Sequence, residues 1–526
     1  MADLAQRLID HVTRGELLDL AAGESVDEAA MRAWGEDRTI EAAVVRDILR
    51  GRLAPDPDPH GLQLRGARIT GRLDAENLTT HVALALFDCL LTEGMVARNA
   101  HLPYLVLERC RLEHPDESPL AADWLTASRV SLEGATVIGA TESAAVSLIY
   151  ARISGVVDCS GARLLNPDGR ALDADGLRCG GGLYLRDGFE AVGDGELGLV
   201  RLIGADIEQL DCTGAKLRND SGPALMADGM RADQGVRLRA GFEAVGASDA
   251  GAVRLLQACI GELACTGGKV RNDTGPALVF HDLRVDGNAL LRRGFEALGS
   301  GEFPTIQLPG VRISGSLDLD PARLEHPDPS HRLDVDGLEY GDLAESWRDW
   351  LDLLRDATPY YAPQPYQQLA AAQRAAGHDR DARAVLIAQR HDQLRRAATT
   401  PGERAWGLLT WLTLGYGYQP WRALLGLLAI VLASVFLAVL GPGAHGGLAR
   451  TVPRDGTAVS CSTVDRIGVG LDFGLPLIKT GARSDCTTTD TAAGQALTAA
   501  GWTLQACAWA FATLFVAGFT GAVRKT

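Results

Sequence analysis

The sequence of 526 residues predicts a mainly β fold: a β-solenoid with units of about 53 residues, extended by N-terminal helices, an αα-hairpin and two C-terminal transmembrane helices. Two observations lead to this prediction. GFEAVG begins at Gly188 and Gly241 and GFEALG begins at Gly294, so the copies lie 241 − 188 = 53 and 294 − 241 = 53 residues apart. Residues 421–440 and 495–523 are the longest apolar segments. A fixed period indicates stacked units, and about 20 apolar residues suffice to span a bilayer.

The composition predicts a folded protein and argues against a nucleic-acid binder. Hydrophobic residues make up 46% of the chain and charged residues 22%, which is too apolar for global disorder. Acidic residues outnumber basic ones by 67 − 51 = 16, giving a net charge of −16. A protein that binds DNA or RNA needs a basic surface to displace counterions, so we expect no nucleic-acid partner.

Residues 1–54 are predicted to form a helical cap at the N-terminus. Apolar residues recur at helical spacing near the start of the chain, and a second helix is expected across 26–49. Residues 55–60 are rich in alternating Pro and Asp and are predicted to be a linker, because proline ends helices. Asp3 and Arg7 interrupt the apolar run that a secretory signal requires, so we expect no export signal.

Residues 61–340 carry the repeat and are predicted to form the solenoid. Cys159, Cys212 and Cys265 recur at the same spacing of 53. Short apolar runs alternate with Asn-Asp, Asp-Gly and Gly turns, which is typical of short strands. We expect two coils and four strands in each unit. The alternative is a β-propeller, whose blades also contain four strands but close into a ring.

Motifs that would indicate catalysis have simpler interpretations. Residues 193–198 match G-x-G-x-x-G, but the sequence that follows predicts a strand, whereas a dinucleotide site needs a helix there. Residues 413–417 resemble a potassium selectivity filter, yet no span precedes them. Two coils per unit would place successive repeat cysteines about 10 Å apart, beyond disulfide distance. We therefore expect no catalytic, cofactor-binding or metal-binding residues and no cofactor.

The solenoid is followed by predicted helices that lead to the membrane. Residues 341–404 are expected to form a helical hairpin around Gly377 and a basic juxtamembrane segment, because apolar residues lie at helical spacing on both sides of that glycine. Residues 405–440 would form an aromatic-rich interfacial segment and the first transmembrane helix. Residues 441–494 would form an outer loop, and 495–526 the second transmembrane helix with a basic tail.

Basic residues at the ends of the two apolar segments predict the orientation. The positive-inside rule places the flank richer in Lys and Arg in the cytoplasm, so both termini are expected there, in a plasma-membrane protein with two spans. The orienting residues are Arg395, Arg396, Arg404 and Arg422 before the first span and Arg524 and Lys525 after the second. Small residues in the spans also allow a homo-oligomer to form through the transmembrane helices.

The predicted outer loop contains two of the ten cysteines, Cys461 and Cys486. An oxidising exterior favours a disulfide between them. The alternative is that both remain free thiols.

Several segments resemble a group of actinobacterial membrane proteins. They are LRGARITG at Leu64, ISGSLD at Ile313, YQQL at Tyr366, GYGYQPWRAL at Gly415 and VAGFTGAVRK at Val516. The group consists of membrane-anchored β-solenoid proteins similar in style to membrane-anchored pentapeptide-repeat proteins. Its members are often labelled membrane-associated oxidoreductases. The resemblance implies a bacterial membrane protein and supplies no catalytic residues.

Three hypotheses about function follow. The leading one is a membrane-anchored cytoplasmic solenoid that serves as a scaffold and binds a protein partner on its long face, without catalysis. The second is a membrane-associated oxidoreductase with a cofactor pocket that the sequence does not reveal. The third is an oligomeric membrane sensor or pore.

Overall fold

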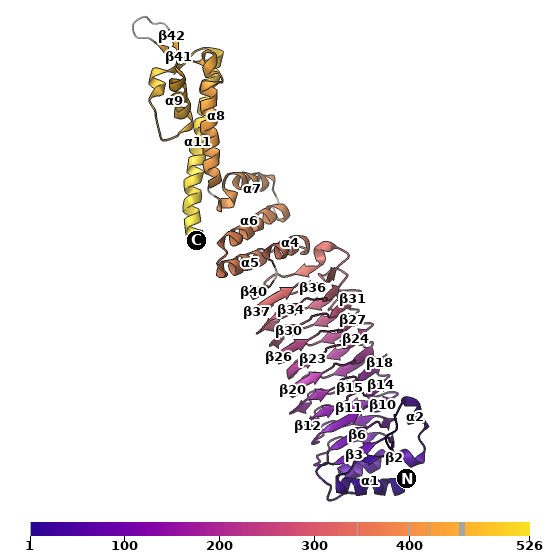
Figure 1. The fold of residues 1–526 in the computed structure, drawn as a ribbon. Coiled ribbons are helices and arrows are strands. Elements are labelled where there is room, and N and C mark those ends of the chain that lie inside the picture. The colour runs from indigo at the N-terminus through magenta and orange to yellow at the C-terminus, as the bar shows by residue number, and fades with distance from the viewer. Residues whose placement is uncertain (1, 345, 398–399, 420, 452–457, 526) are drawn as a thin grey trace. The chain divides into compact units, whose positions relative to one another are not determined.

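The structure is a computed structural model that describes residues 2–344, 346–397, 400–419, 421–451 and 458–525. The chain divides into two compact units, Met1–Ala372 and Gln373–Thr526. The first unit is a β-solenoid of about 12 turns, in which the strands of successive turns lie side by side (Figure 1). The second unit is mainly helical.

Three parallel sheets form the faces of the solenoid. They contain 17, 12 and 11 strands, and we call them the A, B and C sheets in that order. The first regular strand is β3 (Leu62–Arg65) and the last is β40 (Glu339–Leu343). The strands of the B sheet are β2 (Thr39–Glu41), β4 (Arg68–Thr70), β7 (Leu90–Leu91), β10 (Arg111–His114), β14 (Thr136–Gly139), β18 (Arg163–Asn166), β21 (Glu190–Gly193), β24 (Lys216–Asn219), β27 (Glu243–Gly246), β31 (Lys269–Asn272), β35 (Glu296–Leu298) and β38 (Arg323–Glu325). This open parallel stack confirms the solenoid and excludes the propeller.

One turn visits the three sheets in order. After β18 in the B sheet, the chain enters β19 (Arg170–Asp173) in the C sheet and β20 (Arg178–Tyr184) in the A sheet, and then returns to the B sheet at β21. Between the start of β18 and the start of β24 the chain forms six strands, so the expectation of four strands over this stretch is wrong. The prediction counted each run of apolar residues as one strand, and it therefore missed strands that directly follow one another around a corner.

Charges alternate in sign along the exposed column of the B sheet. Arg163 lies beside Glu190, Glu190 beside Lys216, and Lys269 beside Glu296. The Arg163 Nε and Glu190 Oε2 atoms are 2.9 Å apart, and Lys269 Nζ lies 3.2 Å from Glu296 Oε1. Opposite charges on neighbouring strands stabilise a sheet, so this column favours the observed stacking of turns.

The interior of the solenoid combines apolar layers with buried asparagines. Phe189, Phe242 and Phe295, from the three GFEA sequences, are fully buried. Asn219, 1% exposed, donates from Nδ2 to the carbonyls of Gly195 and Pro223 at 2.8 Å each. Its Oδ1 accepts from the Gly195 N–H at 3.0 Å. The Asn219 side chain therefore closes its own turn and ties it to the preceding one.

A buried carboxylate joins turns near the N-terminal end. Asp88 is 5% exposed and accepts hydrogen bonds from Arg65 Nε at 2.7 Å and Arg109 Nε at 2.9 Å. Burial by itself raises the pKa of Asp88, but the hydrogen bonds and charges of the two arginines outweigh it and lower that pKa.

The N-terminal cap contains α1 (Ala2–Arg14), α2 (Glu28–Ala33) and α3 (Ala42–Leu49). The single helix expected across 26–49 is wrong, because β2 lies between α2 and α3 and pairs with β4. Asp27 caps α2 by accepting from the Ala30 N–H. The cap thus supplies a strand that covers the first edge of the B sheet, which matters because an exposed sheet edge invites aggregation.

Helices also cover the last turn. They are α4 (Trp347–Asp356) and α5 (Pro363–Ala375). Gln364 Nε2 donates to the Leu338 carbonyl at 2.9 Å, and Gln368 Nε2 donates to the Tyr340 carbonyl at 2.8 Å. These amides satisfy carbonyls at the final edge of the A sheet, which no further turn would pair.

The second unit is built around two long helices. Its helices are α6 (Asp379–Arg396), α7 (Pro401–Leu414), α8 (Trp421–Val439), α9 (Thr463–Gly474), α10 (Ala482–Asp485) and α11 (Ala492–Lys525). Two segments are long and apolar enough to cross a membrane: 421–439 in α8 and 492–517 in α11. In the most apolar 18-residue stretch of each, only 17% and 11% of the residues, respectively, are buried. Most of this apolar surface is therefore exposed.

The segment predicted as an outer loop, 441–494, has secondary structure of its own. It contains α9, α10 and an antiparallel sheet of β41 (Leu448–Thr451), β42 (Ala458–Ser460) and β43 (Thr487–Thr488). Residues 452–457 lie outside the described chain.

Candidate functional site: a groove on the solenoid

A groove of about 870 Å³ follows the A sheet where its strands bend. The register of the strands shifts between Cys179 and Gly182 and again between Ile207 and Gln209, so pairing at this corner is interrupted on these turns. Gly180 and Gly181 lie close to the turn before them: a Cβ at Gly180 would stand 2.4 Å from the Ser154 carbonyl oxygen. The corner therefore requires glycine, and the absence of side chains there leaves the groove open.

Two arginines on adjacent turns line this groove. Arg152 pairs in register with Arg178, and both are exposed. Their side chains form no ion pair or hydrogen bond with any residue in the described parts of the chain. Neighbouring strands are about 4.8 Å apart, so two like charges face one another, an arrangement that costs stability. The B sheet avoids this cost by alternating its charges.

The next turns add acidic groups to the same groove. Asp206 follows Arg178 in register, and Glu208 lies two residues further along that strand. Glu208 accepts a hydrogen bond from Gln234 Nε2. Asp233 is paired with Arg231 at 2.8 Å. The groove thus has a cationic part at Arg152 and Arg178 and an anionic part next to it.

The repeat cysteines are buried and have the chemistry of core residues. Burial raises the pKa of the Cys265 thiol to about 12 and raises the pKa values of Cys159 and Cys212 as well. Cys179 borders the groove, and its pKa is also raised, chiefly by burial. A reactive cysteine needs a lowered pKa, so these thiols are poor nucleophiles.

The other motifs fall in structural positions. Residues 193–198 form the turn between β21 and β22 (Val200–Arg201), and no helix follows them. Residues 413–417 end α7 and continue into a short 3-10 turn. Among the residues that the structure describes, no three His, Cys, Asp or Glu side chains gather in a way that could hold a metal ion.

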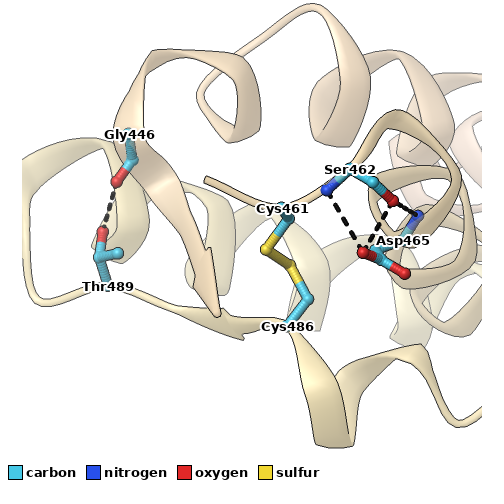
Figure 2. Close-up of a disulfide and its surroundings, with 6 residues drawn as sticks. All are labelled: Gly446, Cys461, Ser462, Asp465, Cys486 and Thr489. Carbon is cyan, nitrogen blue, oxygen red and sulfur yellow. Dashed lines mark hydrogen bonds between the residues drawn. A yellow bond between two sulfur atoms is a disulfide. The ribbon is translucent and has the colours of Figure 1, made fainter. Parts of the chain in front are cut away.

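The two cysteines of the 441–494 segment form a disulfide. Cys461 and Cys486 are joined, with their Cα atoms 6.1 Å apart (Figure 2). Beside this disulfide, Ser462 and Asp465 form a capping box at the N-terminus of α9. The disulfide therefore fixes the start of α9 to the strand that precedes α11.

The basic residues expected to orient the chain lie at helix ends. Arg395 and Arg396 occupy the last turn of α6, and Arg404 lies in the first turn of α7. Arg422 Nη1 donates to the Trp411 carbonyl at 3.0 Å. Arg524 and Lys525 end α11; their side chains, and Thr526, lie outside what the structure describes.

Sequence reasoning missed the groove because its residues come together only through the register of successive turns. A signal was present: Arg-x-x-Gly occurs in strands of the A sheet at Arg152, Arg178, Arg284 and Arg312, and elsewhere in the chain at Arg32, Arg68, Arg201, Arg374 and Arg404. No protein-family model, curated protein or solved structure matches this chain.

Proposed function

We propose that this protein is a membrane-anchored solenoid that holds a macromolecular partner along the groove of the A sheet. The observation that carries the proposal is the pair Arg152 and Arg178, two exposed cations on adjacent turns beside the glycine corner, whose side chains form no ion pair or hydrogen bond among the described residues. Like charges placed together cost stability, and that cost is recovered when an anion binds between them. No catalytic group is needed for this role.

The charge pattern of the groove favours an extended peptide. Consecutive turns present two arginines and then Asp206 and Glu208, so a chain lying along the groove would place acidic residues first and basic residues next. The four turns at Arg152, Arg178, Asp206 and Asp233 cover about 14 Å at a strand spacing of about 4.8 Å, a length that about five residues of an extended peptide span. The partner on this proposal is a protein segment of mixed charge.

We also propose that α8 and α11 span the plasma membrane with both chain ends in the cytoplasm and 441–494 outside. The apolar, exposed surface of the two helices supports the spans. The arginines at the ends of α6 and α7 support the orientation. In addition, we propose that the 53-residue sequence unit covers two turns; the register offsets of 190 − 163 = 27 and 216 − 190 = 26 support this.

The groove can be tested by charge reversal in the full chain. Tagged wild-type protein and the double variant Arg152→Glu/Arg178→Glu would be purified from solubilised membranes and their co-purifying proteins compared. The matched control is Arg239→Glu/Arg293→Glu, which reverses two exposed charges that do not line the groove. We expect the groove variant alone to lose its partner. Identical partners in all three samples would refute the groove, and an unchanged list after deletion of 61–340 would refute the scaffold.

The topology can be tested independently with a membrane-impermeant maleimide on intact cells. A cysteine introduced in 55–59 should remain unlabelled until the cells are opened. Labelling from outside would show that the orientation is inverted, and with it the cytoplasmic solenoid would be refuted.

A further inference from the structure

Two aromatic side chains are stacked on the outside of the solenoid, at the corner between the C and A sheets. Trp124 is 50% and Tyr150 49% exposed, and their ring centres lie 4.6 Å apart with the ring planes inclined by 29°. Each residue comes two positions before a strand of the A sheet, β12 (Thr126–Ala127) and β16 (Arg152–Ile153) respectively. The stack therefore borders the groove on the turn of Arg152 and on the turn before it.

The backbone at this corner favours small or polar residues, so two aromatic residues are costly there. The φ angle is +59° at Trp124 and +53° at Tyr150. Backbone hydrogen bonds that link successive turns place one residue of each turn at the same corner position; in the other turns it is Asn77, Asn99, Gly176, Gly204, Gly229, Gln257, Asp282 or Gly310. Asparagine and glycine adopt this left-handed conformation readily, whereas a bulky residue is strained in it.

The residues that follow the stack at this corner leave it accessible. A Cβ atom built at Gly176 would stand 2.4 Å from Tyr150 Cδ1, so the Tyr150 ring lies where any other residue at 176 would place its side chain. Cβ atoms at Gly204 and Gly229 would have no described atom within 4 Å outside the adjoining residues. The stack thus ends at a strip of backbone without side chains. Backbone strain is concentrated at functional sites, and here it keeps two aromatic rings beside an open surface.

We propose that Trp124 and Tyr150 bind a large apolar side chain of the same extended peptide whose acidic residues lie at Arg152 and Arg178. This inference rests on the proposed function of the groove. Trp, Tyr and Arg are the residue types that most often dominate the energy of protein interfaces, and all three gather here on three successive turns. Aromatic rings offer a large contact area and lose little conformational entropy when they bind.

The order of the turns predicts the order of residues in the peptide. Trp124 and Tyr150 belong to the first two turns, Arg152 and Arg178 to the second and third, and Asp206 to the fourth. The centres of the aromatic pair and of the cationic pair are therefore one turn apart. That distance is about 4.8 Å, or one to two residues of an extended chain at about 3.3 Å each. The partner should carry a large apolar residue one or two positions from its acidic residues, with basic residues on the far side.

Peptide selection on the full chain tests the proposal. A library of random short peptides would be panned against the purified, detergent-solubilised wild-type chain and the variant Trp124→Asn/Tyr150→Asn. The matched control is Phe303→Asn, which removes an aromatic residue that is 50% exposed and does not line the groove. We expect the wild type and the control to select an apolar residue one or two positions from acidic ones. The aromatic variant should bind that consensus peptide about tenfold more weakly and still select acidic residues.

The outcomes separate this inference from the function on which it rests. If the wild type selects acidic residues without an apolar neighbour, or if the aromatic variant selects the same peptides as the wild type, the aromatic anchor is wrong and the groove remains. If the wild type selects no peptide, or peptides without acidic residues, the proposed groove is refuted and the anchor with it.

Thermal denaturation checks that the aromatic variant is folded. Asparagine occupies the same corner position in the two preceding turns, where Asn99 Nδ2 donates to Asn77 Oδ1 at 2.9 Å. We therefore expect the variant to unfold at a temperature no lower than Phe303→Asn does. A lower midpoint together with unchanged peptide selection would give the stack a purely structural role. Tyr150→Asn alone provides the same comparison in case the double variant does not accumulate.

Discussion

The buried asparagine Asn219 provides the sharpest test of how the solenoid is held together. Replacement by alanine removes two donated hydrogen bonds and one accepted one, and it leaves three backbone groups of Gly195 and Pro223 without that partner. Leaving a buried polar group unpaired costs about 1–3 kcal/mol. The Gly195 and Pro223 carbonyls each keep a second partner, the Gly198 N–H and the Leu199 N–H, both at 2.9 Å. The Gly195 N–H is therefore the group left unpaired, and the expected cost is about 1–3 kcal/mol.

Hydrogen exchange measured by mass spectrometry reports this loss locally, because each turn of a repeat protein contacts mainly its neighbours. A cost of about 2 kcal/mol, the middle of that range, corresponds to exchange about 30-fold faster in peptides that cover the turns around Gly195. Asn219→Asp separates hydrogen bonding from packing: it preserves the shape but replaces the Nδ2 donor with an oxygen that faces two carbonyls. We expect it to be at least as harmful as Asn219→Ala.

The matched control for this experiment is Asn288→Ala. Asn288 is exposed, and its Oδ1 accepts one hydrogen bond, from the Ser316 N–H at 2.9 Å. We expect Asn288→Ala to lower the local free energy of unfolding by about 1 kcal/mol or less, since water can replace the lost hydrogen bond. If Asn219→Ala and Asn288→Ala accelerate exchange equally, the buried asparagine does not hold successive turns together.

Three further predictions concern the solenoid. Phe242→Ala should lower the free energy of unfolding by about 3–5 kcal/mol because the ring is fully buried, and thermal denaturation of the purified chain would show the loss as a lower midpoint. At pH 8 a disulfide reagent should modify the exposed Cys259 in the native chain but Cys265 only after unfolding, since burial raises the Cys265 pKa to about 12; modification of both at equal rates would contradict the burial. Because the folded-state pKa of Asp88 is lowered, its contribution to stability is present above its unfolded pKa of about 4 and is lost as the pH falls through the folded value. Asp88→Asn should therefore reduce stability at pH 7 and flatten its decline in acid, and an unchanged acid profile would contradict this assignment.

The sequence by itself was enough to predict the solenoid, because the repeat is visible as a fixed spacing of residues along the chain. The spacing of Gly188, Gly241 and Gly294 follows from stacking, which makes each turn face the same environment and demand the same residues. The two apolar helices could also be predicted from the sequence, because a long run of apolar residues can be recognised without knowing which residues it contacts.

The tertiary structure alone revealed the groove and the packing of α9 against α8. The groove depends on Arg152 lying beside Arg178 across a turn boundary, and that register is a property of strand pairing. Helix α9 has only 12 residues, and a helix this short depends on tertiary packing for its stability, so the local sequence predicts it only weakly. Its place beside α8 and α11 comes from glycines that matter only when another helix approaches, Gly470 and Gly474 of α9 and Gly501 of α11. Local spacing therefore determined the elements, whereas contacts between residues distant in sequence decided which surfaces they form.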